Sequence, residues 1–495
     1  MRAITNGPVS LVAAALISAA TPLLGCCGEA LVEQDDPGSG GQGGGGAGGD
    51  AVTTSSHGVG GTGGHAGGCA PTWGHVLGGP SSQYARSIAV DGEGDVLASV
   101  QFLSGLALDG APPPGPEGDG FAIVKVDASG AHLWTRTFGE GSTQSEYLPI
   151  AVDGSNGVVL GGSFHGTIDI GEGVQATAPG PAALVVKLDA DGHPLWARGF
   201  PDEFSGARVT NLAVDGEDNI FLVGVLGLGG VDFGWGPLHG DFFLAKLDST
   251  GNPLWAKAFT GALLETRTLA VKSSGAVVLG GSIHDEGVID LGGGPLASAG
   301  GFDVFVAELD GAGNHVHSER FGGEDLQRVY GLAVDPSGDI LLAGTFWGAM
   351  DFGGATLDSP GEYSSFVARL DPSGKHLWSK RLPGDTTVTT LAVLPSGGLI
   401  AGGIFHGDPG TPCGPGTGGP PEISAHLARL NGDGSCLSYE ALGFGGEDYV
   451  AGLAVHASGR VSVVGPFAGA IDFGGGVFTN DGNDGFVASL AECGP

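Results

Sequence analysis

A unit of about sixty residues recurs seven times along this chain, and this recurrence limits the fold more than any other feature. A Leu/Ile-Ala-Val triplet marks each copy, at Ala89, Ala151, Ala213, Ala270, Ala333, Ala392 and Ala454, with successive spacings of 62, 62, 57, 63, 59 and 62 residues. A fixed period of this kind is typical of solenoids, propellers and other arrays of one supersecondary unit. We therefore expect one structural unit, built seven times.

Each unit carries the signals of four short strands. In the copy at 322–382 the four apolar runs are Val329–Val334, Ile340–Phe346, Phe366–Leu370 and His376–Leu382. Turn residues rich in Gly, Pro and Ser separate these runs, and no run shows a helical period. The pattern predicts an all-β fold with four strands in each copy.

The third and fourth runs share a second signature. Sequences such as FAIVKVD, ALVVKLD and FVARLD end the third run, and in four copies a tryptophan stands eight residues after its last apolar residue. These tryptophans are Trp134, Trp196, Trp255 and Trp378, and His317 and Ser438 take the place in copies four and six.

Seven units of four strands fit a seven-bladed β-propeller over residues 69–495. A solenoid is the alternative, but it needs polar capping repeats, and neither end of the repeat region has one. The two ends instead complement each other, because Trp73–Gly79 matches only the fourth strand of a unit and copy seven stops without that strand. The N-terminal strand is therefore predicted to close the ring, which removes both exposed sheet edges.

Residues 1–25 are typical of a secretory signal, with Arg2 followed by the apolar run Val9–Leu24. The run ends in Leu23-Leu24-Gly25-Cys26, which resembles the bacterial lipobox. The resemblance implies cleavage before Cys26 and attachment of palmitate and other lipid to it, whereas an ordinary signal peptide is the alternative. Cys27 is not Asp, which by the same resemblance favours the outer membrane or the cell surface. The mature chain would then be anchored by lipid alone.

Residues 26–68 contain Gly, Ser, Thr and Ala with almost no large apolar side chain. Such a segment cannot bury a core and is expected to be a flexible tether. The whole chain has a formal net charge of −35 with only 19 Lys and Arg. This charge argues against binding to nucleic acid or to an anionic membrane surface.

The copies follow three patterns in a fixed order: AVDxxG, then a strand ending in Gly-aromatic, then FVAKLDxxG. This order resembles the bacterial β-propeller repeat of the SBBP type, and the resemblance covers residues 70–495. That resemblance implies a surface or secreted protein and no catalytic residues. The stretches Lys187–Trp196 and Arg369–Trp378 also resemble the docking repeat of quinoprotein-type propellers, in which the tryptophan packs between blades. One member of that class is an outer-membrane lipoprotein that helps to assemble barrel proteins, although its class usually has eight blades.

Two acidic positions are candidate binding sites. The segment Asp91-Gly-Glu93-Gly-Asp95 resembles half of a calcium loop, which needs oxygen ligands at alternating positions. It lacks the spaced Glu of an EF-hand, and Asp and Gly equally suit a hairpin turn in which the carboxylate accepts a backbone N–H. We expect no cofactor at this position, with calcium as the alternative.

The second acidic position lies in a Gly-x-apolar-Asp-apolar-Gly-Gly link between the second and third strands. Its five members are Asp169, Asp232, Asp290, Asp351 and Asp472. Five carboxylates on equivalent loops would lie on one rim of a ring and form an acidic rim able to bind cations or a basic partner. The alternative is a turn in which each Asp accepts a backbone N–H before Gly-Gly.

Catalytic signatures such as G-x-S-x-G, H-E-x-x-H, C-x-x-C and the P-loop are missing from the sequence. The sequence therefore favours a binding or scaffold module of the cell envelope, with an unknown protein or glycan as its ligand. The alternatives are an outer-membrane assembly lipoprotein and a propeller hydrolase or lyase with its site at the channel mouth.

Two disulfides are predicted for an exported chain. Alignment of the chain ends places Cys69 and Cys493 at adjacent positions of one hairpin turn, within the Cα span of a disulfide. Cys413, in a long loop, and Cys436, in a fourth strand, belong to the same copy and form the second expected pair, which leaves Cys27 over. Non-reducing peptide mapping should recover each pair as one linked species, and alkylated separate peptides would contradict the pairing.

Overall fold

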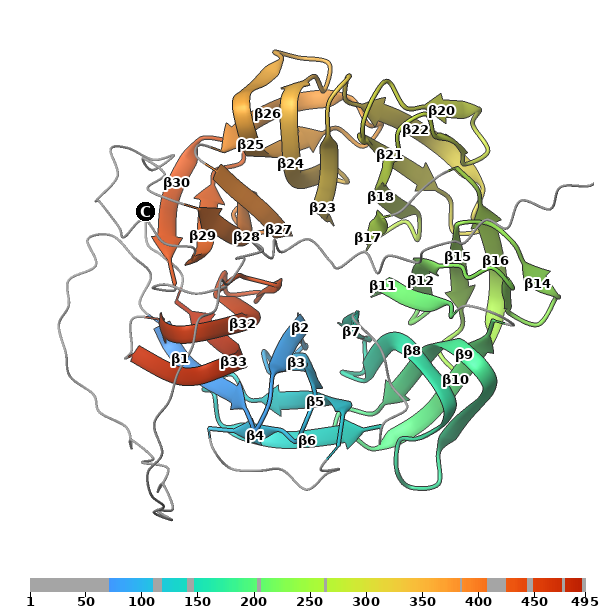
Figure 1. Cartoon of the computed structure of the whole chain (residues 1–495), viewed down its shortest axis with the longest axis vertical. Helices are drawn as coiled ribbons and strands as arrows, with labels where there is room; N and C mark the ends of the chain where they lie inside the picture. The colour runs from blue at the N-terminus through green and yellow to red at the C-terminus, as the bar shows by residue number, and fades with distance from the viewer. Residues whose placement is uncertain are drawn as a thin grey trace, which may run out of the picture. The chain divides into compact units, whose positions relative to one another are not determined.

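Seven antiparallel sheets, six of four strands and one of five, succeed one another around a ring in the computed structural model of the chain (Figure 1). The structure describes residues 71–109, 118–139, 147–202, 206–261, 265–382, 385–406, 424–442, 448–473 and 477–491. The predicted signal segment and tether, with Cys26 and Cys27, lie outside these residues, as do Cys69, Cys413 and Cys493. All the regular elements described are strands, so the predicted all-β fold is confirmed.

Each sheet is one blade, and its strands run outwards from the ring centre in chain order. Blade 1 consists of β2 (Gln83–Val90), β3 (Val96–Phe102), β5 (Gly120–Val126) and β6 (His132–Phe138). Blade 2 consists of β7 (Ile150–Val152), β8 (Val158–Asp169), β9 (Gln175–Leu188) and β10 (Pro194–Pro201). Blade 3 consists of β11 (Arg208–Val214), β12 (Ile220–Val225), β15 (Phe242–Leu247) and β16 (Pro253–Phe259).

The remaining blades repeat the arrangement. Blade 4 consists of β17 (Glu265–Val271), β18 (Val277–Ile283), β21 (Asp303–Leu309) and β22 (His315–Phe321). Blade 5 consists of β23 (Gln327–Val334), β24 (Ile340–Met350), β25 (Leu357–Leu370) and β26 (His376–Leu382). Blade 6 consists of β27 (Asp385–Val393), β28 (Leu399–His406), β29 (Ser424–Leu430) and β30 (Cys436–Ala441). Blade 7 consists of β31 (Gly452–Val455), β32 (Val461–Asp472), β33 (Val477–Leu490) and β1 (Pro71–Gly78), with the short β4 (Ala107–Leu108) added to β1.

The first strands of neighbouring blades contact each other all the way round and form an inner ring. This inner ring consists of β2, β7, β11, β17, β23, β27 and β31. The contact between β31 and β2 joins the last blade to the first, so the described blades form a closed ring. The described residues include no helix with the length and hydropathy that a membrane span requires.

The N-terminal strand completes the last blade, as the sequence predicts. β1 pairs antiparallel with β33, with Trp73 opposite Ser489 and Leu77 opposite Gly485. Leu77 is fully buried, and the hydroxyl of Thr72 donates to the carbonyl of Ser489 across 3.0 Å. The first and last strands of the propeller are therefore held together in one sheet.

One face of the ring carries turns of a single type, and we call it the turn face. The turns that join first to second and third to fourth strands all contain five residues, as in 91–95 and 127–131. In each described turn the backbone N–H of the first residue donates to the carbonyl of the fifth residue, and the carbonyl of the first residue accepts the backbone N–H of the fourth. The fourth residue has positive φ, which glycine adopts without strain, and it is glycine in all of these turns except at Asn156 and Asp218.

The opposite face, which we call the link face, carries the connections between second and third strands and those between blades. Several second-to-third links form hairpins, including β13 (Val231–Asp232) with β14 (Pro237–Leu238) and β19 (Val288–Asp290) with β20 (Pro295–Ala297). Figure 1 shows these hairpins at the periphery of the ring.

The apolar residues on either side of each link Asp wedge between neighbouring blades. Phe233 lies 4.6 Å from Phe200 of the preceding blade, and Phe352 lies 5.0 Å from Phe321, measured between ring centroids. The core consists of seven clusters, each built from two adjacent blades. The link hairpins therefore extend the core outwards and bind each blade to its predecessor.

Deleting residues 69–79 should expose the edge of β33 and uncover the apolar face that Leu77 now covers. We expect the free energy of unfolding to fall by several kcal/mol, because a whole paired strand is lost. Thermal and urea denaturation of the truncated chain measure the loss. Removal of an equal length from the predicted tether is the control, and a truncated chain that melts like this control would contradict ring closure by β1.

Candidate functional site

The tryptophans of the fourth strands dock onto the next blade. Each indole Nε1–H donates to a backbone carbonyl in the third-to-fourth turn of the following blade: Trp73 to Ala128 (3.3 Å), Trp134 to Ala190 (3.1 Å), Trp196 to Ser249 (3.2 Å), Trp255 to Gly311 (3.1 Å) and Trp378 to Gly432 (2.8 Å). The bond from Trp73 crosses the junction between blades 7 and 1. The tryptophans are therefore structural, as their resemblance to docking repeats implies.

The fourth residue of each docking turn lies flat against the indole. A Cβ on Gly130 would come within 2.5 Å of the Trp73 ring, and one on Gly192 within 2.9 Å of the Trp134 ring. Both glycines also have positive φ. In blade 4 the ring of His317 takes the position of the indole and lies against Gly374. The close approach explains why glycine, and no larger residue, recurs at this turn position.

A buried ion pair joins the first turn of most blades to the third strand. The pairs are Asp91–Lys125 at 2.8 Å, Asp153–Lys187, Asp215–Lys246 at 3.1 Å, Lys272–Glu308 and Asp335–Arg369. Burial opposes ionisation of Asp153, but its bonds to Lys187 and Ser155 outweigh this effect and lower its pKa. Removing one partner of such a pair leaves a buried charge, which costs about 3–5 kcal/mol.

Three blades depart from this rule in instructive ways. Blade 4 exchanges the charges, because Lys272 stands in the turn and Glu308 on the third strand. Blade 6 has the apolar Leu394 in the turn position. In blade 7 the position belongs to His456, which is bonded to Ser462 at 2.8 Å, and burial lowers the pKa of His456 to about 4. The imidazole is therefore neutral at neutral pH.

The residues predicted as a calcium half-site belong to this set of ion pairs. Asp91 and Asp95 lie 2.8 and 3.3 Å from the ammonium of Lys125, which occupies the space between them. The other oxygen of Asp91 accepts the backbone N–H groups of Glu93 and Asp95, both at 2.9 Å. Across the described ranges, no three His, Cys, Asp or Glu side chains are grouped to hold a metal ion.

The five link carboxylates lie at equivalent places in the links, and four of them cap their own turns. Oδ1 of Asp169, Asp232, Asp290 and Asp351 accepts at least one glycine N–H two residues later, at 2.6–2.8 Å. Asp472 ends β32, and its backbone N–H donates to the carbonyl of Leu442 in the preceding blade at 3.0 Å. Four of the five carboxylates thus have a local structural bond, and whether the acidic rim also binds cations or a basic partner stays a prediction.

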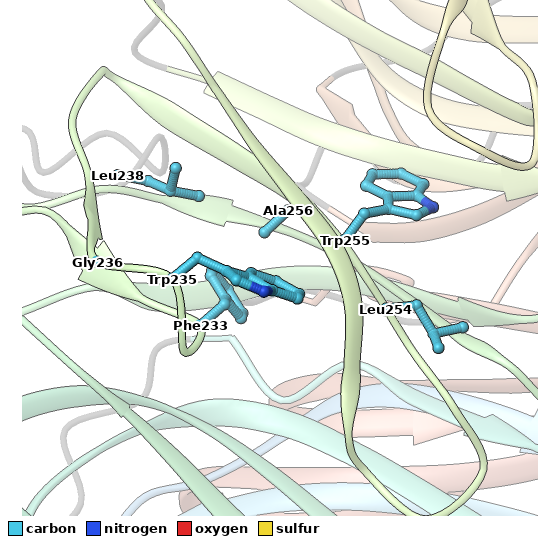
Figure 2. A pocket seen from close by; sticks show the side chains of 7 residues that line it. All are labelled: Phe233, Trp235, Gly236, Leu238, Leu254, Trp255 and Ala256. Atoms are coloured by element: carbon cyan, nitrogen blue, oxygen red, sulfur yellow. The ribbon is translucent and has the colours of Figure 1, made fainter.

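The most exposed tryptophan overhangs a cleft on the outer strand of blade 3. Figure 2 shows Trp235 in the β13–β14 hairpin, with Leu254 and Trp255 on the neighbouring β16. The side chain of Trp235 is 63% exposed. The cleft has a volume of about 330 Å³, and its other lining residues are Phe233, Gly236, Leu238 and Ala256. The lining contains no titratable group, so this cleft offers apolar contact and no acid–base chemistry.

Arginines and aromatic rings meet at the ends where the inner strands begin. The guanidinium carbon of Arg86 lies 4.8 Å from the centre of the Tyr84 ring, that of Arg208 lies 5.6 Å from Tyr147, and that of Arg328 lies 4.3 Å from Phe302. All six side chains are half-buried. These inner-ring pairs lie at the link face, because each inner strand starts where its neighbour in the sheet ends.

Sequence reasoning missed these pairs, although a signal was present. Arg208 and Arg328 stand four residues before the Leu of their triplets, and Tyr84 stands four residues before Ile88. The same position lies next to a register shift in the inner strand, as between Val209 and Asn211. Recurrence of large cationic and aromatic residues at one repeat position is the pattern that could have identified them.

A buried carboxylate occupies the same end of blade 7. Asp448 is fully buried, and its Oδ1 accepts the backbone N–H of Ala468 at 2.8 Å. Its Oδ2 is buried without a hydrogen-bond partner, and burial raises its pKa to about 6. Blades 1 and 5 have the neutral Gln83 and Gln327 at this repeat position, each donating to a link carbonyl. Asp448 is thus an ionisable replacement for a neutral structural amide.

The strand order and ring closure define the chain as a seven-bladed β-propeller. No family model matches the sequence. The chain is 27% identical over 218 residues to the regulatory protein FlaEY of Caulobacter vibrioides, covering 42% of this chain and 23% of that protein. It is 21% identical over 418 residues to the uncharacterized WD repeat-containing protein L264 of Acanthamoeba polyphaga mimivirus, covering 66% of this chain and 30% of that protein.

The chain therefore spans less than a third of the length of these curated relatives. Among solved structures it is similar to the β-propeller domain of the Trilobed protease from Pyrococcus furiosus, with a TM-score of 0.39, 10% identity, and coverage of 84% of this chain and 100% of that one. It is also similar to the Neurospora crassa Pan2 WD40 domain, with a TM-score of 0.32, 10% identity, and coverage of 69% and 89%.

Replacing Asp448 with Asn should stabilise the propeller in a pH-dependent manner. The folded-state pKa of about 6 lies above the ordinary aspartate value of 3.8, so the stability contributed by the protonated carboxyl is lost as pH rises through 6. Asp448→Asn should gain about 1–3 kcal/mol above about pH 7 and almost nothing below about pH 4. Urea denaturation across this pH range measures the gain.

Asp433→Asn is a suitable control for this measurement. Asp433 is an exposed turn carboxylate whose pKa is lowered by the hydrogen bond from Ser435, so its replacement should give no gain at high pH. A pH-independent effect of Asp448→Asn would contradict the titration of Asp448 in this range.

Proposed function

We propose that this chain is a lipid-anchored protein of the cell envelope whose propeller binds a partner through its link face. The observation that carries the proposal is a difference between the two faces of the ring. The turn face repeats one five-residue turn, with the same backbone bonds, at every described first-to-second and third-to-fourth connection. The link face varies from blade to blade in length and in side chains.

The variation of the link face is substantial. Counted from the last pair of the main strand ladder, before any hairpin of the link itself, the connections between second and third strands range from 14 residues (469–482) to 19 residues (284–302). The connections between blades range from two residues (383–384) to eleven (139–149). Docking tryptophans hold the turn face to one geometry, whereas the tips of the links, beyond their apolar wedges, meet no such requirement. Variable loops on a rigid scaffold are the usual place for recognition.

The link face also exposes an aromatic pair suited to contact with a partner. Trp347 and Tyr363, which flank the link of blade 5, are 40% and 42% exposed and meet edge to face with ring centroids 5.0 Å apart. Five of the seven tryptophans serve docking between blades, while Trp235 in the β13–β14 hairpin and Trp347 near the end of β24 have much of their surface exposed. Exposed aromatic residues of this kind are common energetic anchors of binding surfaces.

The anchor belongs to the same proposal. Lipid on Cys26 would hold the protein at the outer membrane or cell surface, and a flexible segment of about 40 residues would give the propeller a mean reach of roughly 35 Å. A protein or glycan of the envelope would then be within range of the link face.

The proposal can be tested with the Cys26→Ser chain, which should leave the membrane fraction and lose palmitate labelling. This released protein should bind saturably to isolated envelopes, and the further change Trp347→Ala should weaken binding by about tenfold or more, because an exposed aromatic anchor is removed. Quantitative co-sedimentation measures both effects.

Leu377→Ala is the matched control. Leu377 is 50% exposed on β26 of the same blade, beside the turn face. Equal losses from the two changes, or the absence of saturable binding, would contradict recognition by the link face. Membrane retention of the Cys26→Ser chain would contradict the anchor alone.

A further inference from the structure

Two arginines of the inner-ring pairs have no carboxylate partner among the described residues. Arg208 makes its contact with the Tyr147 ring, and its Nε is buried without a hydrogen-bond acceptor. Arg86 contacts Tyr84 and donates to Oε1 of Gln101 at 2.8 Å, while its Nε is also buried and unbonded. Each guanidinium therefore retains N–H donors that no described group of the protein uses.

A shortage of acidic residues does not explain the lack of a carboxylate beside these two arginines. Acidic residues outnumber Lys and Arg by 54 to 19, and many other basic side chains find a carboxylate, as Lys125, Lys246 and Arg320 do. An isolated, half-buried guanidinium is costly unless something compensates its charge. The aromatic ring supplies a part of this compensation, about 0.5–2 kcal/mol, and leaves the fork of N–H donors available.

The two arginines flank the same strand. Arg86 lies on β2 and Arg208 begins β11, and both strands contact β7 of the blade between them. The backbone N–H of Ile150 on β7 donates to the hydroxyl of Ser87, next to Arg86, at 3.3 Å. Tyr147, which Arg208 contacts, lies three residues before Ile150. Both guanidinium groups thus belong to one end of three consecutive inner strands.

We propose that this end of blades 1 to 3 binds a small ligand carrying two or more oxyanionic groups, held by Arg86 and Arg208. A guanidinium binds a carboxylate or phosphate through two parallel N–H···O bonds. The inference rests on the proposed function, because it names the chemistry that the link face recognises. A net charge of −35 repels long polyanions, so the ligand is compact.

Arg198 has a similar contact with an aromatic ring but lies outside the proposed site. Its guanidinium carbon lies 5.6 Å from the Trp196 ring, the same distance as in the pair of Arg208 and Tyr147. However, Arg198 lies on the outer strand β10, and its Nη2 donates to the carbonyl of Thr250 in the next blade at 3.3 Å. It is therefore a matched control, with equal charge and a similar ring contact away from the inner ring.

Titration calorimetry of the full propeller with citrate and with pyrophosphate tests the proposal. At about 0.01 M ionic strength, where screening is weak, at least one of the two anions should bind. Arg208→Ala and Arg86→Ala should each weaken that binding by about tenfold or more, and Arg208→Lys should restore part of it. Arg198→Ala should change it by less than about twofold. Melting curves of all variants establish that the ring is intact.

Each outcome decides the matter. Binding of citrate alone indicates a carboxylate ligand, binding of pyrophosphate alone indicates a phosphate ligand, and either result with the expected loss supports the site. Binding of neither anion, or binding that survives loss of both arginines or falls equally with Arg198→Ala, overturns it. If envelopes are still bound saturably through the link face while both anions fail, the oxyanion site is wrong and the proposed function stands.

Discussion

The ring depends on one contact that recurs at six of its seven blade junctions, in which an aromatic side chain of one blade lies on a glycine of the next blade's turn. The indole N–H then bonds to a carbonyl of the same turn, so packing and hydrogen bonding fix the two blades together. The contact requires a five-residue turn with a glycine in the left-handed conformation, which accounts for the uniform turn face. The buried ion pairs act within a blade: each ties the first-to-second turn to the third strand of its own blade, as Asp153 does with Lys187 and Asp215 with Lys246.

This division explains where the protein is free to vary. A longer or shorter turn on the docking face would move the glycine away from the indole and open a gap between blades. The links on the other face contribute apolar wedges such as Phe233 and Phe352, but their tips bear no equivalent constraint. The recognition that we propose for the link face therefore has a mechanical reason, and this reason does not depend on the identity of the ligand.

The sequence predicts the architecture well because its signals are local and repeated seven times. Alternating strands, turn glycines and the unmatched Trp73–Gly79 strand were enough to predict seven blades and their closure. The roles of individual polar residues were less accessible. Asp91 has the spacing of a metal ligand, yet its partner Lys125 lies 34 residues away, and only the fold brings the two together. The inner-ring pairs were missed because Arg208 and Tyr147 come from different blades.

The exchanged pair Lys272–Glu308 has a consequence for how such a gene can change. Copies of a repeat recombine with one another, and each crossover joins the start of one copy to the end of another. A crossover between blades leaves every ion pair intact. A crossover inside a blade, between its first turn and its third strand, would join Lys272 to a lysine from another copy, or an aspartate to Glu308, and so bury two like charges. The reversed pair therefore disfavours crossovers within blade 4, and we expect blade boundaries to be the points at which copies of this propeller can be gained, lost or exchanged.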